Sequence, residues 1–460
     1  MISRSRSVVP SLAFAWALAC VAGAAAERDA SALAWPDVAE RLTKRLRSDD
    51  VEARRAAAAE LPGVGRARGS ALATALLEDP DVEVKVLGAR AAASFRTPGA
   101  TAKVLPWLSE RDVRLRLAAC EVARAVPDPT SILPLARVLS DPETVVRTAA
   151  AEALGTQSSA EAVQPLLSKL DDPNPVVRAS IARSLARIGD PRAVVPLVGK
   201  AQDSAVEVRQ SVARALGDLG DRRAVPALLV MLRDGAVEVR IDALASLGRL
   251  KDGSAVDSIA PLLRDRVPTV RQGAVVALGR IATPRAIQHL VKLLGTGDDV
   301  GANVAVSPVR SALVDVGAAA VPDLLATIAA QGAPAASAGA AWVLGELRAT
   351  EAGIAIESAV RRGTLGAAAG LHALGRIGDP RALPVVLEYL RDPNRDVHKE
   401  AIAAAGSLLD PDEPDGRATE PLAFALRDPK LDPESRVALV QLLGLTGAKR
   451  AAAVVRPFVS

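Results

Sequence analysis

The sequence predicts an all-α fold, an α-solenoid in which about 13 short helical hairpins stack into a right-handed superhelix. Three observations predict it. One sequence motif recurs every 31 residues along much of the chain. Within each copy the apolar residues are spaced by three and four, as on one face of a helix. Half of the residues are hydrophobic but only 2% are aromatic, a composition suited to many thin helical layers.

The period is clearest at a basic position that follows valine in most copies. This position is occupied by Arg178, Arg209, Arg240 and Arg271, and in the preceding copies by Arg147, Arg116, Lys85 and Arg54. Later copies are less regular and place Arg310, Ser337, Ala367, His398 and Arg436 there. Sustained self-similarity at one period is the signature of stacked repeats. We therefore expect regular repeats over residues 36–294, then less regular repeats and a C-terminal capping helix over residues 295–460.

Each unit is expected to hold two antiparallel helices of about 10–13 residues. In the unit around Arg209, apolar residues line one face of a helix over residues 208–219. Gly217 and Gly220 are expected to end this helix, and Asp221 is expected to cap the next one. Prolines early in the first helices predict bends there, at Pro134, Pro165, Pro196 and Pro226.

A hairpin this short buries its apolar side only by stacking on its neighbours. One leucine position recurs with the period and is expected to form the centre of the shared core. It is occupied by Leu154, Leu185, Leu216, Leu247 and Leu278.

The motif D-x-x-x-x-V-R-x-x-A-x-x-x-L-G resembles HEAT repeats, specifically the short variety named after the phycobilisome (PBS) lyases, over about residues 36–458. The resemblance implies that the Asp and Arg of the motif form a ladder between neighbouring units. Four pairs keep both residues: Asp172 and Arg178, Asp203 and Arg209, Asp234 and Arg240, Asp265 and Arg271. Ser337 and Ala367 break the ladder, whereas His398 is expected to replace arginine as a hydrogen-bond donor.

A second set of arginines lies five or nine residues past the ladder position, at Arg183, Arg187, Arg214, Arg249, Arg280 and Arg376. Residues separated by four share one helix face. Stacked units should therefore display a mostly basic stripe over about residues 183–280, interrupted by Asp218. Two interpretations stay open: a surface for an acidic protein segment or anionic polymer, and a solvated face that keeps the protein soluble.

Residue types that carry catalysis or bind metals are scarce. The three histidines are His289, His372 and His398. None forms the paired His-Glu dipeptides of the deoxyhypusine hydroxylases, which share this repeat. Cys120 stands where other units carry alanine, which indicates a small core residue. The acidic segment 410–416 departs from the calcium-binding EF-hand pattern. No catalytic, cofactor-binding or metal-binding residue is predicted.

Residues 1–26 are expected to be a signal peptide, followed by a short linker over residues 27–35. Two arginines precede an apolar run from residue 12 to 21, and three alanines precede Glu27 as a cleavage site. Two alternatives stay open: the segment could remain as an uncleaved N-terminal membrane anchor, or Cys20 could carry a bacterial lipid anchor.

The charge balance argues against nucleic acid as a partner. The formal net charge is +4, and cleavage of the signal peptide would remove Arg4 and Arg6 from it. Nucleic-acid binding requires a clustered basic footprint, which a nearly neutral chain does not indicate.

The sequence therefore predicts an exported scaffold in the periplasm or cell envelope, or outside the cell, that binds a protein partner with an acidic segment. One alternative is an enzyme or accessory factor similar to the PBS lyases or the hydroxylases. Another is a structural spacer in an envelope assembly.

Overall fold

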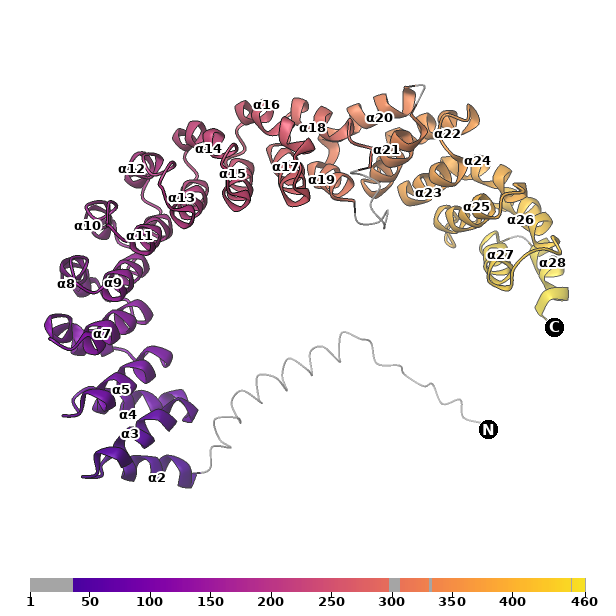
Figure 1. Ribbon diagram of the computed structural model, residues 1–460. Coiled ribbons are helices and arrows are strands. Elements are labelled where there is room, and N and C mark those ends of the chain that lie inside the picture. The colour runs from indigo at the N-terminus through magenta and orange to yellow at the C-terminus, as the bar shows by residue number, and fades with distance from the viewer. Residues whose placement is uncertain (1–35, 298–306, 331–332, 448, 460) are drawn as a thin grey trace, which may run out of the picture. The chain divides into compact units, whose positions relative to one another are not determined.

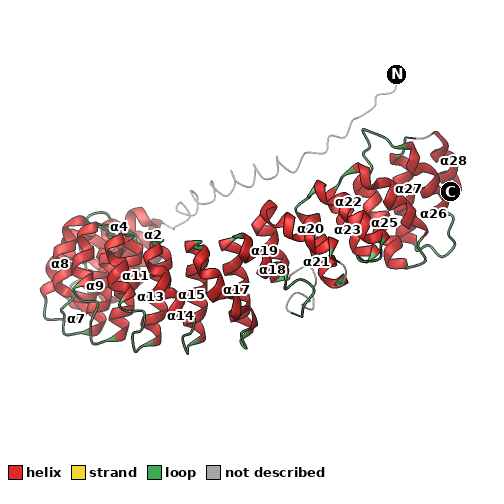
Figure 2. Ribbon diagram, turned by 90° about the horizontal axis from the view of Figure 1, so that it is seen from above, coloured by secondary structure: helices red, strands yellow, loops and turns green. Residues whose placement is uncertain are grey.

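The structure, a computed structural model, describes residues 36–297, 307–330, 333–447 and 449–459. The expected signal peptide, the linker and Cys20 lie outside these residues. Within them, every regular element is an α-helix or a 3-10 helix and no strand occurs (Figures 1 and 2). The chain is an all-α solenoid, as predicted from the repeat; the handedness of its superhelix stays a prediction.

The chain divides into two compact units, residues 1–219 and 220–460. This division separates two groups of packed helices. The sequence boundary at residue 295 separates regular from irregular repeats, and it stays a prediction.

In the first unit, six hairpins follow one another. Their first helices are α2 (Pro36–Leu46), α4 (Arg66–Leu76), α6 (Ala100–Val104), α8 (Ile132–Val138), α10 (Val163–Leu167) and α12 (Val194–Val198). Their second helices are α3 (Val51–Glu60), α5 (Val82–Ser94), α7 (Val113–Ala125), α9 (Thr144–Thr156), α11 (Pro175–Ile188) and α13 (Val206–Leu219). The second helices from α5 to α13 lie side by side in one row, and α8, α10 and α12 flank this row (Figure 1).

The second unit continues the pattern. Its first helices are α14 (Val225–Met231), α16 (Val256–Ile259), α18 (Pro284–Val291), α20 (Val321–Ala329), α22 (Gly353–Arg361), α24 (Leu383–Glu388) and α26 (Thr419–Leu426). Its second helices are α15 (Val237–Leu250), α17 (Pro268–Ile281), α19 (Pro308–Val316), α21 (Pro334–Glu346), α23 (Ala367–Ile377), α25 (Arg395–Leu408) and α27 (Pro433–Leu445), and α28 (Lys449–Val459) follows as the expected terminal helix.

The second helices have well-defined ends, of which α11 is an example. The side chain of Asn174 accepts a hydrogen bond from the backbone N–H of Val176, and Pro175 occupies the first helical position. At the other end, Gly189 adopts a left-handed conformation with φ of 77°. Ala282 occupies the same left-handed position after α17, with φ of 52°, although an alanine side chain disfavours it.

The first helices are shorter than expected. In four units of the pattern, a 3-10 turn of three residues precedes an α-helix of five to seven residues. The proline lies at the second or third α-helical position, at Pro134, Pro165, Pro196 and Pro226. Proline has no N–H to donate to the carbonyl four residues earlier, so the preceding turn closes with bonds across three residues instead.

The leucines expected at the centre of the core are buried. Leu154, Leu185, Leu216, Leu247 and Leu278 are each 0% exposed. Since they come from successive second helices, the apolar core runs continuously through the row within each unit.

The expectation for Gly217 was wrong, because this residue is buried inside α13 and Gly220, with φ of 70°, follows the end of the helix. The equivalent residue of α9, Gly155, shows the role of this position. A Cβ atom there would lie 2.7 Å from the Cβ of Ser184 on α11. The glycine thus allows two neighbouring second helices to approach closely.

One stretch among the described residues, Pro308–Ala329, has the length and mean hydropathy, 1.6, of a membrane-crossing segment. In the structure it is not a single straight helix. It comprises α19, a 3-10 turn that begins at Gly317 and α20, and both helices contribute buried residues to the solenoid core.

Candidate partner-binding surface

The ladder arginines are held inside the stack. Nε of Arg178 donates to Oδ2 of Asp203 at 2.8 Å, and its Nη2 donates to Oδ1 at 2.7 Å. Its Nη1 donates to the backbone carbonyl of Asp172 at 2.8 Å. The two side chains of the ion pair are only 11% and 6% exposed. Arg178 therefore joins its own hairpin, through a carbonyl, to the next hairpin, through a carboxylate.

This geometry recurs in the first unit. The same two-sided contact joins Arg54 to Asp79, Arg116 to Asp141 and Arg147 to Asp172. Each aspartate lies 25 residues after its arginine and belongs to the next copy of the motif. The residue six before the arginine supplies a backbone carbonyl, and it is Asp141 for Arg147 and Asp172 for Arg178 but Ser48 for Arg54 and Glu110 for Arg116. The carboxylates of Asp141 and Asp172 bind the previous hairpin.

Two ladder residues lie on either side of the division between the units. Nη1 of Arg209 donates to the carbonyl of Asp203 at 2.8 Å. Oδ1 of Asp234 accepts from the backbone N–H of Ala236 at 2.9 Å. Both contacts repeat those that the equivalent residues make elsewhere in the row.

In the second unit the ladder is looser. Nη2 of Arg240 lies 3.7 Å from Oδ1 of Asp265, and Nε of Arg240 is buried without a hydrogen-bond partner. Nη1 of Arg271 donates to the carbonyl of Asp265 at 3.0 Å. Both arginines keep the hydrogen bond to a backbone carbonyl of their own hairpin.

The expectation that His398 replaces a ladder arginine was wrong. Its Nε2 is buried and has no hydrogen-bond partner. Asp432 lies in the next hairpin, and its carboxylate instead accepts a hydrogen bond from Arg395 at 3.2 Å and lies 3.8 Å from Nζ of Lys399. An imidazole is shorter than an arginine side chain. In addition, Asp432 caps α27 four residues before Arg436 rather than six.

Burial and the ladder bonds also set the protonation of the ladder carboxylates. Burial of Asp203 favours its neutral form, but hydrogen bonds from Arg178 and from the backbone N–H of Ala205 outweigh this and lower its pKa. The pKa of Asp172 is lowered in the same way, with Arg147 and the N–H of Asn174 as donors acting against burial. Both groups are therefore charged at neutral pH, as the ladder requires.

The arginines of the predicted stripe differ from the ladder because they lie at the surface. In the first unit, Arg183 and Arg187 project from α11 and Arg214 from α13, and all three are exposed. The Arg183 side chain is half exposed; it donates to Oγ of Ser211 at 3.3 Å and lies 3.9 Å from the carboxylate of Glu152. The contacts between α11 and α13 place these three residues on neighbouring helices.

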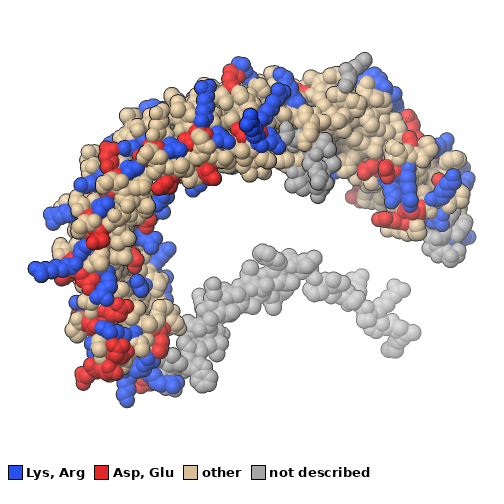
Figure 3. Space-filling view, viewed as in Figure 1, with Lys and Arg blue, Asp and Glu red and all other residues tan. Residues whose placement is uncertain are grey.

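The basic stripe has an acidic border that the prediction missed. The helix position of Arg183 is occupied by Glu152 on α9 and by Glu121 on α7. The 31-residue period extended backwards from Arg183 would have identified both glutamates. In agreement with this, Lys and Arg side chains alternate with Asp and Glu over these helices, and no uniformly basic face is visible (Figure 3).

The remaining arginines of the predicted stripe lie in the second unit. Nη2 of Arg249 donates to Oγ of Ser246 at 2.8 Å, and Arg280 is exposed near the end of α17. Arg376 is engaged differently, because its Nε and Nη2 donate to Glu346 at 2.9 and 2.7 Å. The structure thus describes the stripe as separate groups in the two units, and its continuity from residue 183 to 280 stays a prediction.

A surface arginine motif that the sequence reasoning also missed repeats at the turns before the first helices. In each case, an Asp accepts from the backbone N–H of the Arg two residues later and also pairs with its guanidinium. The pairs are Asp190 and Arg192, Asp221 and Arg223, Asp379 and Arg381, and Asp415 and Arg417. The side-chain hydrogen bond is the largest factor that lowers the pKa of each aspartate.

The structure also places the other candidate residues. Cys120 is 0% exposed, and burial raises the pKa of its thiol to about 12. His372 lies at the surface, with Nδ1 3.3 Å from Glu400. Residues 410–414 form an exposed acidic turn. Within the described parts of the chain, no three His, Cys, Asp or Glu residues come together as a group that could hold a metal ion.

A row of helical hairpins with a continuous core, buried Arg–Asp bridges and an exposed second-helix face defines an α-solenoid repeat protein. Comparison with protein-family models gives the family. HEAT repeats match residues 101–171, 163–239 and 228–307, and a PBS lyase HEAT-like repeat matches residues 368–392. The chain belongs to the HEAT-repeat proteins of the PBS-lyase-like type.

Solved structures share the fold at low sequence identity. Kap121p bound to Ste12p aligns with a TM-score of 0.53 and 16% identity, covering 93% of this chain and 51% of that one. Kap95p, whose binding induces the switch loops of RanGDP to adopt the GTP-bound conformation, aligns with a TM-score of 0.52 and 14% identity, covering 93% and 68%.

A third structure is the complex of CpcE and CpcF of phycocyanin lyase from Nostoc sp. PCC7120. It aligns with a TM-score of 0.33 and 19% identity, covering 48% of this chain and 92% of that one. No curated protein sequence matches the chain.

Proposed function

We propose that this protein is a binding scaffold whose second-helix face in the first unit holds an acidic segment of a partner protein. The observation that carries the proposal is the difference between its two arginine sets. The ladder arginines of the first unit, such as Arg147 and Arg178, are buried and bonded on both sides, so the fold accounts for them. Arg183, Arg187 and Arg214 lie exposed at the surface, where their charge adds little to stability.

The geometry of the face suits an extended acidic segment. Arg183 and Arg187 are one helical turn apart on α11, and Arg214 lies on the adjacent helix α13. A guanidinium presents a planar pair of N–H donors that matches the two oxygens of a carboxylate. Glu121 and Glu152 on the preceding helices would repel the same segment, so they fix which end of the row it occupies.

The related structures support this use of the fold. Kap121p was solved bound to Ste12p, and its helices align with most of this chain. A HEAT solenoid offers an extended surface rather than a deep pocket, and binding partners along such a surface is what repeat proteins commonly do. The fold alone does not specify the partner, so the proposal depends on the arginines named above.

The test is affinity capture from envelope extract by the full-length chain with a C-terminal tag. We expect a saturable partner that the triple variant R183E, R187E and R214E no longer retains. The capture should also weaken as salt rises, because exposed charges are screened over about 10 Å at 0.1 M ionic strength. The matched control is R66E, R68E and R137E, which reverses three exposed arginines on α4 and α8.

The two variants separate the possible outcomes. Loss of the partner in the stripe variant but not in the control supports the binding face. Equal capture by both variants contradicts it. A chain that captures no saturable partner under any condition contradicts the scaffold role itself and favours a structural spacer.

We further propose that the protein acts in the cell envelope after export. The support is the order of basic, apolar and small residues over positions 1–26. Cell fractionation and N-terminal sequencing test it: export predicts an envelope or periplasmic protein that begins at Glu27. A protein that begins at Met1 in the cytoplasm contradicts the proposal, and a mature chain that begins at a lipid-modified Cys20 indicates an anchored form.

A further inference from the structure

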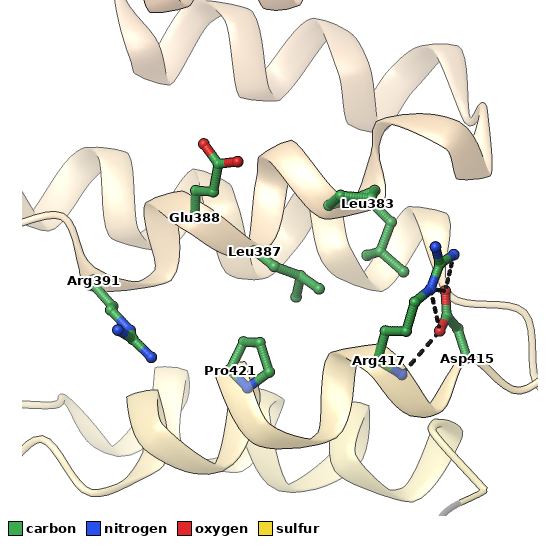
Figure 4. A pocket seen from close by; sticks show the side chains of 8 residues that line it. Leu383, Leu387, Glu388, Arg391, Asp415, Arg417 and Pro421 are labelled. Atoms are coloured by element: carbon green, nitrogen blue, oxygen red, sulfur yellow. Dashed lines mark hydrogen bonds and ion pairs between the residues drawn. The ribbon is translucent and has the colours of Figure 1, made fainter.

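A depression lies between α24 and α26 in the second unit, at the surface formed by first helices (Figure 4). Its volume is about 510 Å³. It is lined by Leu383, Pro384, Leu387, Glu388, Arg391, Asp415, Arg417 and Pro421. Leu383 and Leu387 point from α24 towards α26, and Pro421 faces them from the opposite wall.

The depression lies where two neighbouring hairpins touch only lightly. The first helices α24 and α26 make few contacts with each other, and the second helices of the same hairpins, α25 and α27, pack far less extensively than α23 and α25 do. An apolar floor is therefore left open where Pro421 rather than a larger side chain faces Leu387.

The two ends of the depression differ in charge. At one end Arg417 donates to both oxygens of Asp415, with distances down to 2.7 Å, so its charge is balanced. At the other end, the guanidinium of Arg391 lies over the ring of Phe424 at 4.2 Å and forms no ion pair with a described carboxylate. Glu388 accepts from Arg361 at 3.2 Å and points away from the floor in Figure 4.

The stacking of Arg391 on Phe424 holds the Arg391 guanidinium in a defined position. A cation over an aromatic face is attracted by the ring, which restricts the guanidinium and reduces the entropy lost when it binds a carboxylate. Phe424 is itself 54% exposed, so the stack lies at the surface, where a partner can reach it. An apolar cleft with a few fixed polar groups is the usual form of a binding site.

We propose that this depression is a second docking site, which holds a short acidic peptide segment of a partner protein. A large aliphatic side chain of the segment fills the space over Leu383, Leu387 and Pro421, and the following carboxylate pairs with Arg391. The inference rests on the proposed scaffold function. It adds a separate site of defined chemistry on the first-helix side of the second unit.

The test uses fluorescein-labelled peptides and the full chain, with binding read as fluorescence anisotropy. The probe has the sequence GSGLDDGSG, and its matched controls are GSGADDGSG, without the aliphatic side chain, and GSGLKKGSG, with reversed charge. We expect the probe to bind with a Kd below about 1 mM and each control peptide to bind roughly tenfold more weakly.

The variant R391E should bind the probe about tenfold or more weakly than the wild type does, and it should bind the GSGLKKGSG peptide more tightly than the probe. The matched control is R362E. Arg362 directly follows α22, its Nη1 donates to Oγ of Ser358, and it does not line the depression. Thermal unfolding followed by circular dichroism verifies that both variants remain folded.

Three results would overturn the proposal: no binding of the probe, equal binding of the alanine peptide, or probe binding that R391E leaves unchanged. The stripe variant R183E, R187E and R214E is expected to keep the binding that R391E removes, because its substitutions lie in the first unit, and any signal that the stripe variant alone removes belongs to the stripe. Failure of this site and failure of the stripe are therefore distinguishable.

Discussion

Arg178 and Asp203, 25 residues apart in the sequence, form a buried bidentate ion pair that joins two successive hairpins. The same arginine also donates to the carbonyl of Asp172 in its own hairpin. A single side chain thus joins the turns of two successive hairpins. The contact recurs without a break from Arg116 to Asp203 and also joins Arg54 to Asp79, whereas Lys85 stands at the ladder position between them.

Removal of one partner from this pair should be costly. We expect R178A to lower the free energy of unfolding by about 3–5 kcal/mol, because it leaves the Asp203 carboxylate buried without its cation. Equilibrium urea denaturation measures the change. The control is R192A, which removes a 57% exposed arginine that pairs with Asp190 in its own turn and donates to the carbonyl of Ala160, and which should cost less than about 1 kcal/mol. Equal effects of the two variants would contradict the role of the ladder.

The ladder also predicts how stability depends on pH. The folded pKa values of Asp172 and Asp203 lie below their unfolded values, so the folded state stabilises the charged forms. Their contribution should be complete above the unfolded pKa of about 3.9 and should be lost as the pH falls through the lowered folded values.

The urea midpoint measured from about pH 7 down to pH 3 checks this dependence. We expect D203N to be less stable at neutral pH and to lose less stability on acidification than the wild type. D412N changes an exposed loop residue and should keep the wild-type profile. A D203N profile parallel to that of the wild type would rule out this source of acid sensitivity.

The buried leucines provide a direct test of the core. We expect L216A to cost about 2–5 kcal/mol, because Leu216 is 0% exposed and its truncation leaves a cavity. Urea denaturation measures the loss. The matched substitution L133A removes a leucine that is 64% exposed and should have a much smaller effect. A loss below about 0.5 kcal/mol for L216A would contradict its placement in the core.

The close contact of α9 with α11 predicts that Gly155 does not tolerate even one methyl group. G155A should be destabilised by about 1–3 kcal/mol, since its Cβ would lie 2.7 Å from Ser184. The second substitution S184G should recover part of the loss, because it removes the two closest atoms. G235A is the control, since no heavy atom lies within 4 Å of its added Cβ.

The left-handed end of α17 predicts a stabilising substitution. Ala282 has φ of 52°, where a side chain is disfavoured and glycine is not. We expect A282G to raise the free energy of unfolding by roughly 1 kcal/mol, and G189A, at the same position after α11, to lower it by a similar amount. Thermal unfolding of the two variants compares them, and shifts of the same sign would contradict this account.

Much of the fold could be predicted from the sequence because its causes are local. The 31-residue period placed Arg178 and Leu185 on second helices, and apolar spacing of three and four identified the buried face. Proline and aspartate signals also indicated where the first helices begin. Helix periodicity and helix-start signals act within about one helical turn, so they can be recognised without knowing how the neighbouring hairpin packs.

The candidate sites depended on distances between hairpins, which a period does not contain. The sequence indicated an Arg–Asp ladder, but only packing brought Arg178 to Asp203 and left His398 without a partner. The depression beside Arg391 became evident only in the folded chain, whereas the acidic border at Glu152 follows from the period once it is extended backwards from Arg183.

The sequence by itself determined the repeat, the helices and the shared apolar core, because backbone hydrogen bonds and side-chain spacing act within about one turn. The tertiary structure alone decided that Gly217 belongs inside α13 rather than at its end, and that α24 and α26 leave a depression lined by Leu387. The physical reason is that the spacing between stacked helices is set by all of their contacting side chains together. A difference of a few ångströms in that spacing determines whether a residue packs, pairs or remains open to a partner.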